Sequence, residues 1–426
     1  MLAAGFLGGA KGRLLPASVP FRFFAATAVF HLAGWIVVLI WGGDFSGFAG
    51  GVGAPLGALH LITLGVLAST AMGAALQLLP VSTRQSIVAV WPISLAFWLF
   101  VPGVILFSVS AILVNLEGLV LGGGLAAAAL AIFALLVADN LRRARGMAVV
   151  VAHGWAALAA LVALLTLGFG SAIDFLAPIL SDHQAAAGAH LVAAGYGFMG
   201  FLAVGFSYVL LPMFALSQQP SPMLAWSGLW LGCLALIGAG AGFFVETLYL
   251  LAGSILIGIW AAGCYLAAMS QVWKKRMRKR LGLPFVMIRI GWAFLPVSLI
   301  VALLVVLDVP IPNGPAIVAV LLLIGWQLTF MLGVLQRIMP FLGSMHAQVQ
   351  PGSQSLVARF TDALELQISA IAHFLALALL LIGLIFDLGL VIQAAGACGV
   401  IGALAFGWFT LRVIRAVFAV PQIPTD

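Results

Sequence analysis

The chain has 426 residues, of which 64% are hydrophobic and only 7% are charged, and its formal net charge is +7. Soluble domains carry about 25% charged residues, so the composition excludes a soluble protein and places most of the chain in lipid. The basic excess indicates orientation and contact with anionic lipid headgroups rather than nucleic-acid binding. The three cysteines lie inside apolar segments and form neither a spaced metal motif nor an expected disulfide.

Twelve apolar segments are long enough to cross a bilayer, which requires about 20 residues in a helix. Because the lipid interior offers no hydrogen bonds to the backbone, we expect each segment to be α-helical. In chain order the expected helices cover residues 21–41, 56–80, 87–112, 119–138, 147–168, 187–212, 223–244, 248–271, 285–307, 315–340, 368–387 and 389–411. The sequence therefore predicts an all-α integral membrane protein, with a loop over 169–186 and a short surface helix near 358–367.

Charged residues are sorted between the two sides of the predicted bundle. With the N-terminus inside and the helices alternating, all 18 Lys and Arg lie on the inner side or just inside the membrane at that end. The outer loops carry only acids. This positive-inside pattern predicts a multi-pass protein of a bacterial inner membrane with both termini cytoplasmic. The first apolar run is already long enough to span the bilayer, so we expect no cleavable signal peptide.

Three of the twelve segments end alike, with Pro80, Pro212 and Pro340 each following a run of large side chains. Those prolines are 132 and then 128 residues apart. The first two segments also begin alike, with His60 and His190 each followed by Leu and, five residues after the histidine, by Gly. A fixed period of this length indicates internal repeats. The sequence therefore predicts three pseudo-repeats of four helices.

The helix that precedes each proline-ended segment carries a Gly-Trp pair, at Gly34-Trp35, Gly154-Trp155 and Gly291-Trp292. This second marker supports the same period. We therefore expect one membrane domain over 1–426, with approximate repeat units 1–80 together with 368–426, then 87–212, then 223–340.

Acidic side chains are almost absent from the interiors of the spans. This argues against a proton pump with a carboxylate relay and against an ion-coupled transporter with a buried acidic site. The spans contain histidines instead, and an ionisable residue inside a membrane is a functional hypothesis by default. Neutral imidazole is a good ligand for haem iron and for copper.

His60 and His190 are the leading candidate ligands. Both lie about one turn from the outer end of helices that run from outside to inside, so they share a depth. His31 on the first helix is the third choice, and His183 comes seven residues before His190. These four histidines form a predicted outer cluster of metal ligands.

His153 and His373 lie near the inner ends of the fifth and eleventh helices, with His346 on the same side. They form a predicted inner cluster, and the first two are further candidate cofactor ligands. Each histidine also has a structural interpretation, a hydrogen bond to a neighbouring helix. For His183 and His346 a solvated position in a loop is the favoured interpretation.

Twelve helices in three units of four, with a histidine early in the second helix and a proline closing it, resemble subunit I of the haem–copper oxidases. The pattern resembles more closely the NnrS family, smaller haem- and copper-containing relatives linked to nitric oxide metabolism. The residues that carry the resemblance are His60 through Pro80, echoed by His190 through Pro212 and by Gln336 through Pro340. The resemblance implies a haem–copper oxidase subunit I-like fold and makes His60 a haem ligand.

The chain also departs from the oxidase pattern. Those oxidases place a Tyr four residues after the helix-6 His, where this chain has Ala194, and they carry further histidines on helices 7 and 10, where this chain has none. A standard oxygen-reducing proton pump is therefore not expected. Because the helix-10 partner of His60 is missing, His190 or His31 would have to replace it as a ligand.

The favoured hypothesis is an integral membrane haem protein, with haem b as the expected cofactor and copper as a candidate. Its role would be electron transfer, or the binding or reduction of a small gas such as nitric oxide, with a redox protein or a quinone as candidate partner. The alternatives are a cofactor-free transporter and a non-catalytic assembly or sensing factor of a respiratory complex. The sequence does not decide whether the protein is an enzyme.

Overall fold

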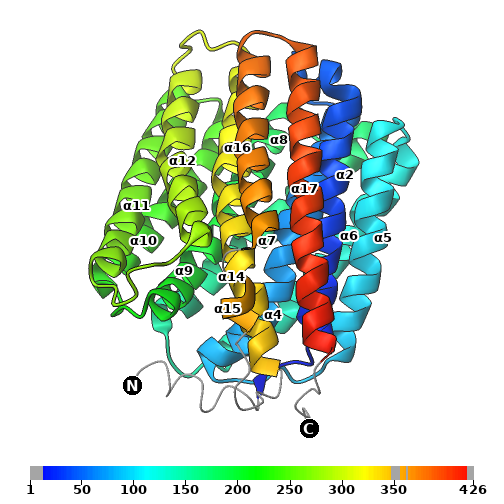
Figure 1. The fold of residues 1–426 in the computed structure, drawn as a ribbon. Coiled ribbons are helices and arrows are strands. Elements are labelled where there is room, and N and C mark those ends of the chain that lie inside the picture. The colour runs from blue at the N-terminus through cyan, green and yellow to red at the C-terminus, as the bar shows by residue number, and fades with distance from the viewer. Residues whose placement is uncertain (1–12, 347–355, 361–362, 420–426) are drawn as a thin grey trace.

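The computed structural model describes residues 13–346, 356–360 and 363–419. Within these residues twelve helices are long and apolar enough to cross a membrane, which agrees with the twelve segments expected from the sequence. They stand side by side as one bundle, and the chain enters α2 and leaves α17 at the same end of it (Figure 1).

The helices follow one another through short connections. The nine uninterrupted spans are α2 (Ser18–Trp41), α5 (Trp91–Ile112), α6 (Leu116–Arg142), α7 (Ala148–Leu176), α10 (Pro222–Val245), α11 (Leu248–Lys274), α12 (Leu283–Val306), α16 (Leu364–Ile385) and α17 (Gly389–Phe418). A 3₁₀ turn, η2 (Gly42–Phe45), follows α2, and a short helix, α15 (Leu356–Phe360), precedes α16.

The other three spans each contain a π-helical segment. They are α3–η3–α4 (Ala54–His60, Leu61–Ala68, Ser69–Thr83), α8–η4–α9 (His183–Val192, Ala193–Met199, Gly200–Ala215) and α13–η5–α14 (Gly314–Val320, Leu321–Leu328, Thr329–His346). These are the three spans with the repeated proline, which lies inside the helix in each, because α4, α9 and α14 continue three to six residues past it. A π turn at the same place in each supports the three-unit organisation, which remains our prediction.

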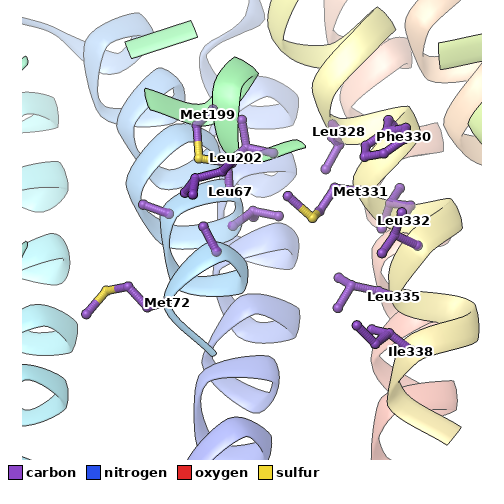
Figure 2. Close-up of a cluster of buried hydrophobic side chains, with 14 of the residues drawn as sticks. Leu67, Met72, Met199, Leu202, Leu328, Phe330, Met331, Leu332, Leu335 and Ile338 are labelled. Atoms are coloured by element: carbon purple, nitrogen blue, oxygen red, sulfur yellow. The ribbon is translucent and has the colours of Figure 1, made fainter. Parts of the chain in front are cut away.

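The same three spans form the centre of the molecule. Buried residues make up 72%, 78% and 78% of their most apolar windows, against 17–56% for the other nine. Leucine, methionine and phenylalanine side chains from all three fill the space between them, among them Leu67, Met199 and Met331 (Figure 2). The π segments also meet directly, because the Gln327 side-chain amide donates a hydrogen bond to the Gly195 carbonyl oxygen.

Two sequence expectations differ from the structure. The expected loop over 169–186 is largely helical, because α7 continues to Leu176 and α8 begins at His183. The remaining turn is held by Asp174, whose carboxylate accepts hydrogen bonds from the amides of Ile179 and Leu180 at 2.7 Å. The expected short helix near 358–367 also has different bounds, because a short helix, α15, covers Leu356–Phe360, residues 364–367 belong to the membrane helix α16, and residues 361–362 lie outside the described part.

Candidate metal centre

His60 and His190 both lie shortly before the π segments of their spans. His60 is the last residue of α3, directly before η3, and His190 lies three residues before η4. A π turn is a single wide turn that is found frequently at functional sites, since it changes the direction of the side chains on either side of it. The repeated element thus sets two histidines at one depth on neighbouring helices.

The structure brings these two side chains together. The ring centroids of His60 and His190 are 6.4 Å apart and their planes differ by 27°. Two imidazole nitrogens on opposite sides of one metal, each at about 2.0 Å, place the ring centroids roughly 6 Å apart. The observed centroid separation is close to this value, and the two rings lie in a stacked arrangement.

Hydrogen bonds fix which nitrogen each ring offers. His60 Nδ1 lies 3.0 Å from the Leu56 carbonyl oxygen, and His190 Nδ1 lies 3.1 Å from the Leu164 carbonyl oxygen. A carbonyl only accepts, so each Nδ1 carries the proton and each Nε2 of the neutral ring keeps its lone pair. Metal-binding histidines in proteins are oriented by this same contact, in which the other ring nitrogen donates to a carbonyl or carboxylate.

Both Nε2 atoms are accessible. Among the described residues neither has a hydrogen-bond partner, and neither belongs to the buried polar atoms that lack one. The two side chains are partly buried, with the His60 ring 4.6 Å from the Phe107 ring between centroids. Two neutral imidazoles with unpaired Nε2 atoms are a donor set that fits haem iron or copper.

The His190 ring packs against Gly168 of helix α7. A Cβ atom built on Gly168 would lie 2.4 Å from Cε1 of His190, so only glycine allows the ring to lie against this helix. Gly168 and Phe107 could not be predicted from the sequence, because no sequence pattern indicates that their helices lie next to the two histidines.

His183 lies apart from this pair. It begins α8, seven residues before His190, which is two helical turns or about 10 Å along the axis. Its Nδ1 donates to Asp174 Oδ2 at 2.8 Å, and its ring lies 4.4 Å from that of Phe175. His183 therefore belongs to the turn between α7 and α8.

His31 lies on α2 with its ring against α17. It is 1% exposed, its Nε2 accepts a hydrogen bond from Trp35 Nε1 at 3.1 Å, and its ring packs edge-on against Phe406. It lies within electrostatic range of His373. The structure thus places His31 away from His60 and His190, near a histidine that the sequence assigned to the inner side.

His373 has a hydrogen bond of its own. The Thr329 hydroxyl donates to the Ile324 carbonyl oxygen, so it accepts from Nε2 of His373, at 2.7 Å. In both His31 and His373 the Nε2 atom is therefore already bonded within the protein. Their Nδ1 atoms, in contrast, are buried without a hydrogen-bond partner among the described residues, so a ligand role for these two histidines stays a prediction.

His153 and His346 also lie in separate places. His153 Nδ1 donates to the Val149 carbonyl oxygen at 2.8 Å and its ring lies 5.4 Å from that of Tyr208. His346 is 4% exposed and accepts a hydrogen bond from the Gln77 amide at 3.1 Å, so it is not the solvated loop residue that the sequence suggested. Among the described residues no three His, Cys, Asp or Glu side chains group as ligands of one metal. Among the described residues the structure thus brings His60 together with His190 and places His31 near His373, which differs from the two predicted clusters.

Comparison with known proteins identifies the fold. Neither the protein-family models nor the curated proteins give a match. Among solved structures, the chain is similar to a haem–copper terminal oxidase determined as a dimer by cryo-EM, with a TM-score of 0.70 and 11% sequence identity over 96% of this chain and 85% of that one.

The protein is therefore a multi-pass membrane protein with the fold of haem–copper oxidase subunit I. At 11% identity the similarity establishes the arrangement of the helices only. What this chain binds has to be argued from its own side chains.

Proposed function

We propose that this protein is a membrane electron-transfer protein whose metal is held by His60 and His190. The observation that carries the proposal is the facing pair itself, with ring centroids 6.4 Å apart and both Nδ1 atoms bonded to backbone carbonyls. Haem iron is the first assignment, and the fold of the structural neighbour supports it.

Bound at this site, haem supplies one-electron oxidation and reduction. The two histidines would hold the iron, and their backbone hydrogen bonds would keep the rings in place. Because two protein side chains would hold one iron, we favour electron transfer over the binding or reduction of nitric oxide.

Copper(I) is the second candidate for the same site. In the described part of the chain, Lys and Arg lie at the other end of the spans, whereas the end near His60 and His190 carries acids. A haem there would find no arginine or lysine for its propionates, and two-coordinate copper(I) needs no such partner.

The test is a spectrum and a metal analysis of the purified full-length protein. If the metal is haem iron, we expect a Soret band with a low-spin haem spectrum and about one iron per chain. If the metal is copper, we expect about one copper per chain and no Soret band. His60→Ala and His190→Ala should each lower the bound metal by at least tenfold, since the remaining imidazole is a single ligand.

His183→Ala is the matched control, because His183 lies on the same helix as His190 and bonds to Asp174. It should keep the metal. Wild-type protein that folds but holds neither iron nor copper would refute the proposal and return the cofactor-free transporter as the leading function. Full metal in both alanine variants would refute the assigned ligands.

A further inference from the structure

A second feature of the molecule is a long apolar cavity between the helices of its middle third. Its volume is about 350 Å³, within the range of small-molecule sites. The lining comes from the spans α8–η4–α9 and α13–η5–α14 and from α10, α11 and α12, with His153 of α7. His60 and His190 are not part of it.

The cavity is elongated. Its lining runs along one span from Gly188 to Tyr208, which is 20 residues or about 30 Å of helix. A volume of about 350 Å³ over this length gives a narrow passage. Such a shape suits a ligand with a long hydrocarbon chain better than a disc-shaped porphyrin.

The lining is also uncharged. Among its residues there is no Asp, Glu, Lys or Arg, and most are glycine or aliphatic residues. An anionic ligand such as a fatty acid or a haem with its propionates would therefore be bound without a counter-ion, at a high cost in a low-dielectric site. The cavity favours a neutral molecule.

Two unused polar groups meet at the inner end of the passage. His153 Nδ1 is bonded to the Val149 carbonyl oxygen, so Nε2 is left as an acceptor, and no described residue bonds to it. The Tyr208 hydroxyl has no hydrogen-bond partner among the described residues and is buried. The two rings are 5.4 Å apart between centroids. A free acceptor and a free donor on two adjacent rings complement a hydroxyl group, which needs both.

The tyrosines around this pair differ from Tyr208. Tyr265 donates to Ser207 Oγ and accepts from Trp292 Nε1, both at 2.9 Å. Tyr196 pairs with Ser298 Oγ at 2.9 Å. Because their hydroxyls are satisfied within the protein, Tyr208 is singled out as the group that requires a ligand.

We propose that this cavity binds an isoprenoid quinol, with its chain along the apolar passage and a head-group hydroxyl between His153 and Tyr208. The quinol class combines the three required properties, which are a neutral charge, a long apolar chain and an aromatic hydroxyl. The evidence for this binding site comes from the residues of the cavity and does not involve His60 or His190. A bound quinol would be an electron carrier for the electron-transfer function proposed above.

The test uses a photoreactive azidoquinone on the full-length protein in nanodiscs, with the labelled peptides identified by mass spectrometry. We expect labelling of peptides that contain His153, Tyr208 or Tyr265, and competition by decylubiquinol. Oleic acid at equal concentration should not compete. Equal competition by oleic acid, or labelling outside the cavity, would overturn the proposal.

Two substitutions on α11 test whether the labelling depends on the cavity. Gly258 lines the cavity with room for a side chain, and Gly258→Phe should fill the passage and reduce labelling by at least tenfold. Gly263 is exposed on another face with nothing within 4 Å, and Gly263→Phe should label as wild type. Unchanged labelling in Gly258→Phe would contradict the site.

The head-group contact is tested by Tyr208→Phe, which removes only a hydroxyl without a partner and should weaken decylubiquinol binding about five- to tenfold. Unaltered binding would refute the head-group assignment. Metal content, measured on the same preparations, should stay at the wild-type value in Gly258→Phe. A Soret band lost in Gly258→Phe and kept in His60→Ala would show instead that a haem occupies this cavity, which would overturn both proposals in a recognisable way.

Discussion

At the scale of the residue, Gly168 decides where the His190 ring can lie. A Cβ atom at this position would overlap Cε1 of His190, which is 2.4 Å away, so Gly168→Ala must push the ring from its place. Gly168 is a positioning residue, because it acts only through His190. We expect at least a tenfold loss of metal affinity with unchanged helix content, measured by metal titration and circular dichroism.

Gly170→Ala on the same helix is the control for this prediction. Its added Cβ would meet Leu180 at an ordinary 3.9 Å, so both affinity and helix content should stay at wild-type values. Wild-type metal affinity in the Gly168→Ala protein would show that the position of the His190 ring does not depend on its contact with Gly168.

The sequence predicted single residues only where a pattern repeated. His60 and His190 could be paired from sequence because the same motif surrounds both, which fixes their depth on two helices. His31 and His373 were assigned to opposite sides, yet the structure places them within electrostatic range. Depth along a helix is readable from a sequence, whereas the face that a side chain presents depends on helix rotation and packing.

At the scale of the element, the three π segments are the feature that hydrophobic patterning could not reveal. Length and hydropathy predict a membrane helix without specifying whether its amides bond four or five residues back. The repeated prolines nevertheless located the three spans that contain these segments. The Gln327 bond to the Gly195 carbonyl shows how two of the π segments are joined, since the wide turn leaves backbone groups open to side chains.

Removing one residue from η3 tests the role of the π turn. Deletion of Leu64 would allow regular α-helical bonding and would change the rotation of His60 about the helix axis relative to α4. We expect a helical, membrane-inserted protein that has lost at least nine-tenths of its metal. The readouts are metal per chain and thermal unfolding followed by circular dichroism.

The matched deletion is Leu323 in η5, a π segment whose span carries no ligand histidine before it. Folded protein from this deletion should retain metal. If the Leu64 deletion also retained its metal, the π segment would have no part in aiming His60.

At the scale of the whole molecule, low charge and twelve long apolar segments were sufficient to predict the bundle, and the oxidase-like structure agrees with it. Packing of the middle third was not predictable in the same way. The cavity between α9, α10, α11 and α12 arises from glycines and alanines on several helices at once. No local pattern in the sequence records such a gap.

The orientation of the bundle decides which side of the membrane each site faces. Because all 18 basic residues lie at one end, we expect that end to be cytoplasmic. In a cysteine-free background, Ser181→Cys on the acidic side and Ser86→Cys on the basic side place exposed thiols at opposite ends. A membrane-impermeant maleimide should label the first in intact spheroplasts and the second only after permeabilisation.

The opposite labelling pattern would refute the expected orientation. Each of the two sites would then face the other side of the membrane. In the expected orientation the His60–His190 pair lies near the outer face, whereas His153 and Tyr208 lie towards the cytoplasmic ends of α7 and α9. An electron passing from the cavity to the metal would therefore travel outwards across the bilayer. This direction follows from the distribution of charge along the chain, and the labelling experiment measures it independently of either ligand.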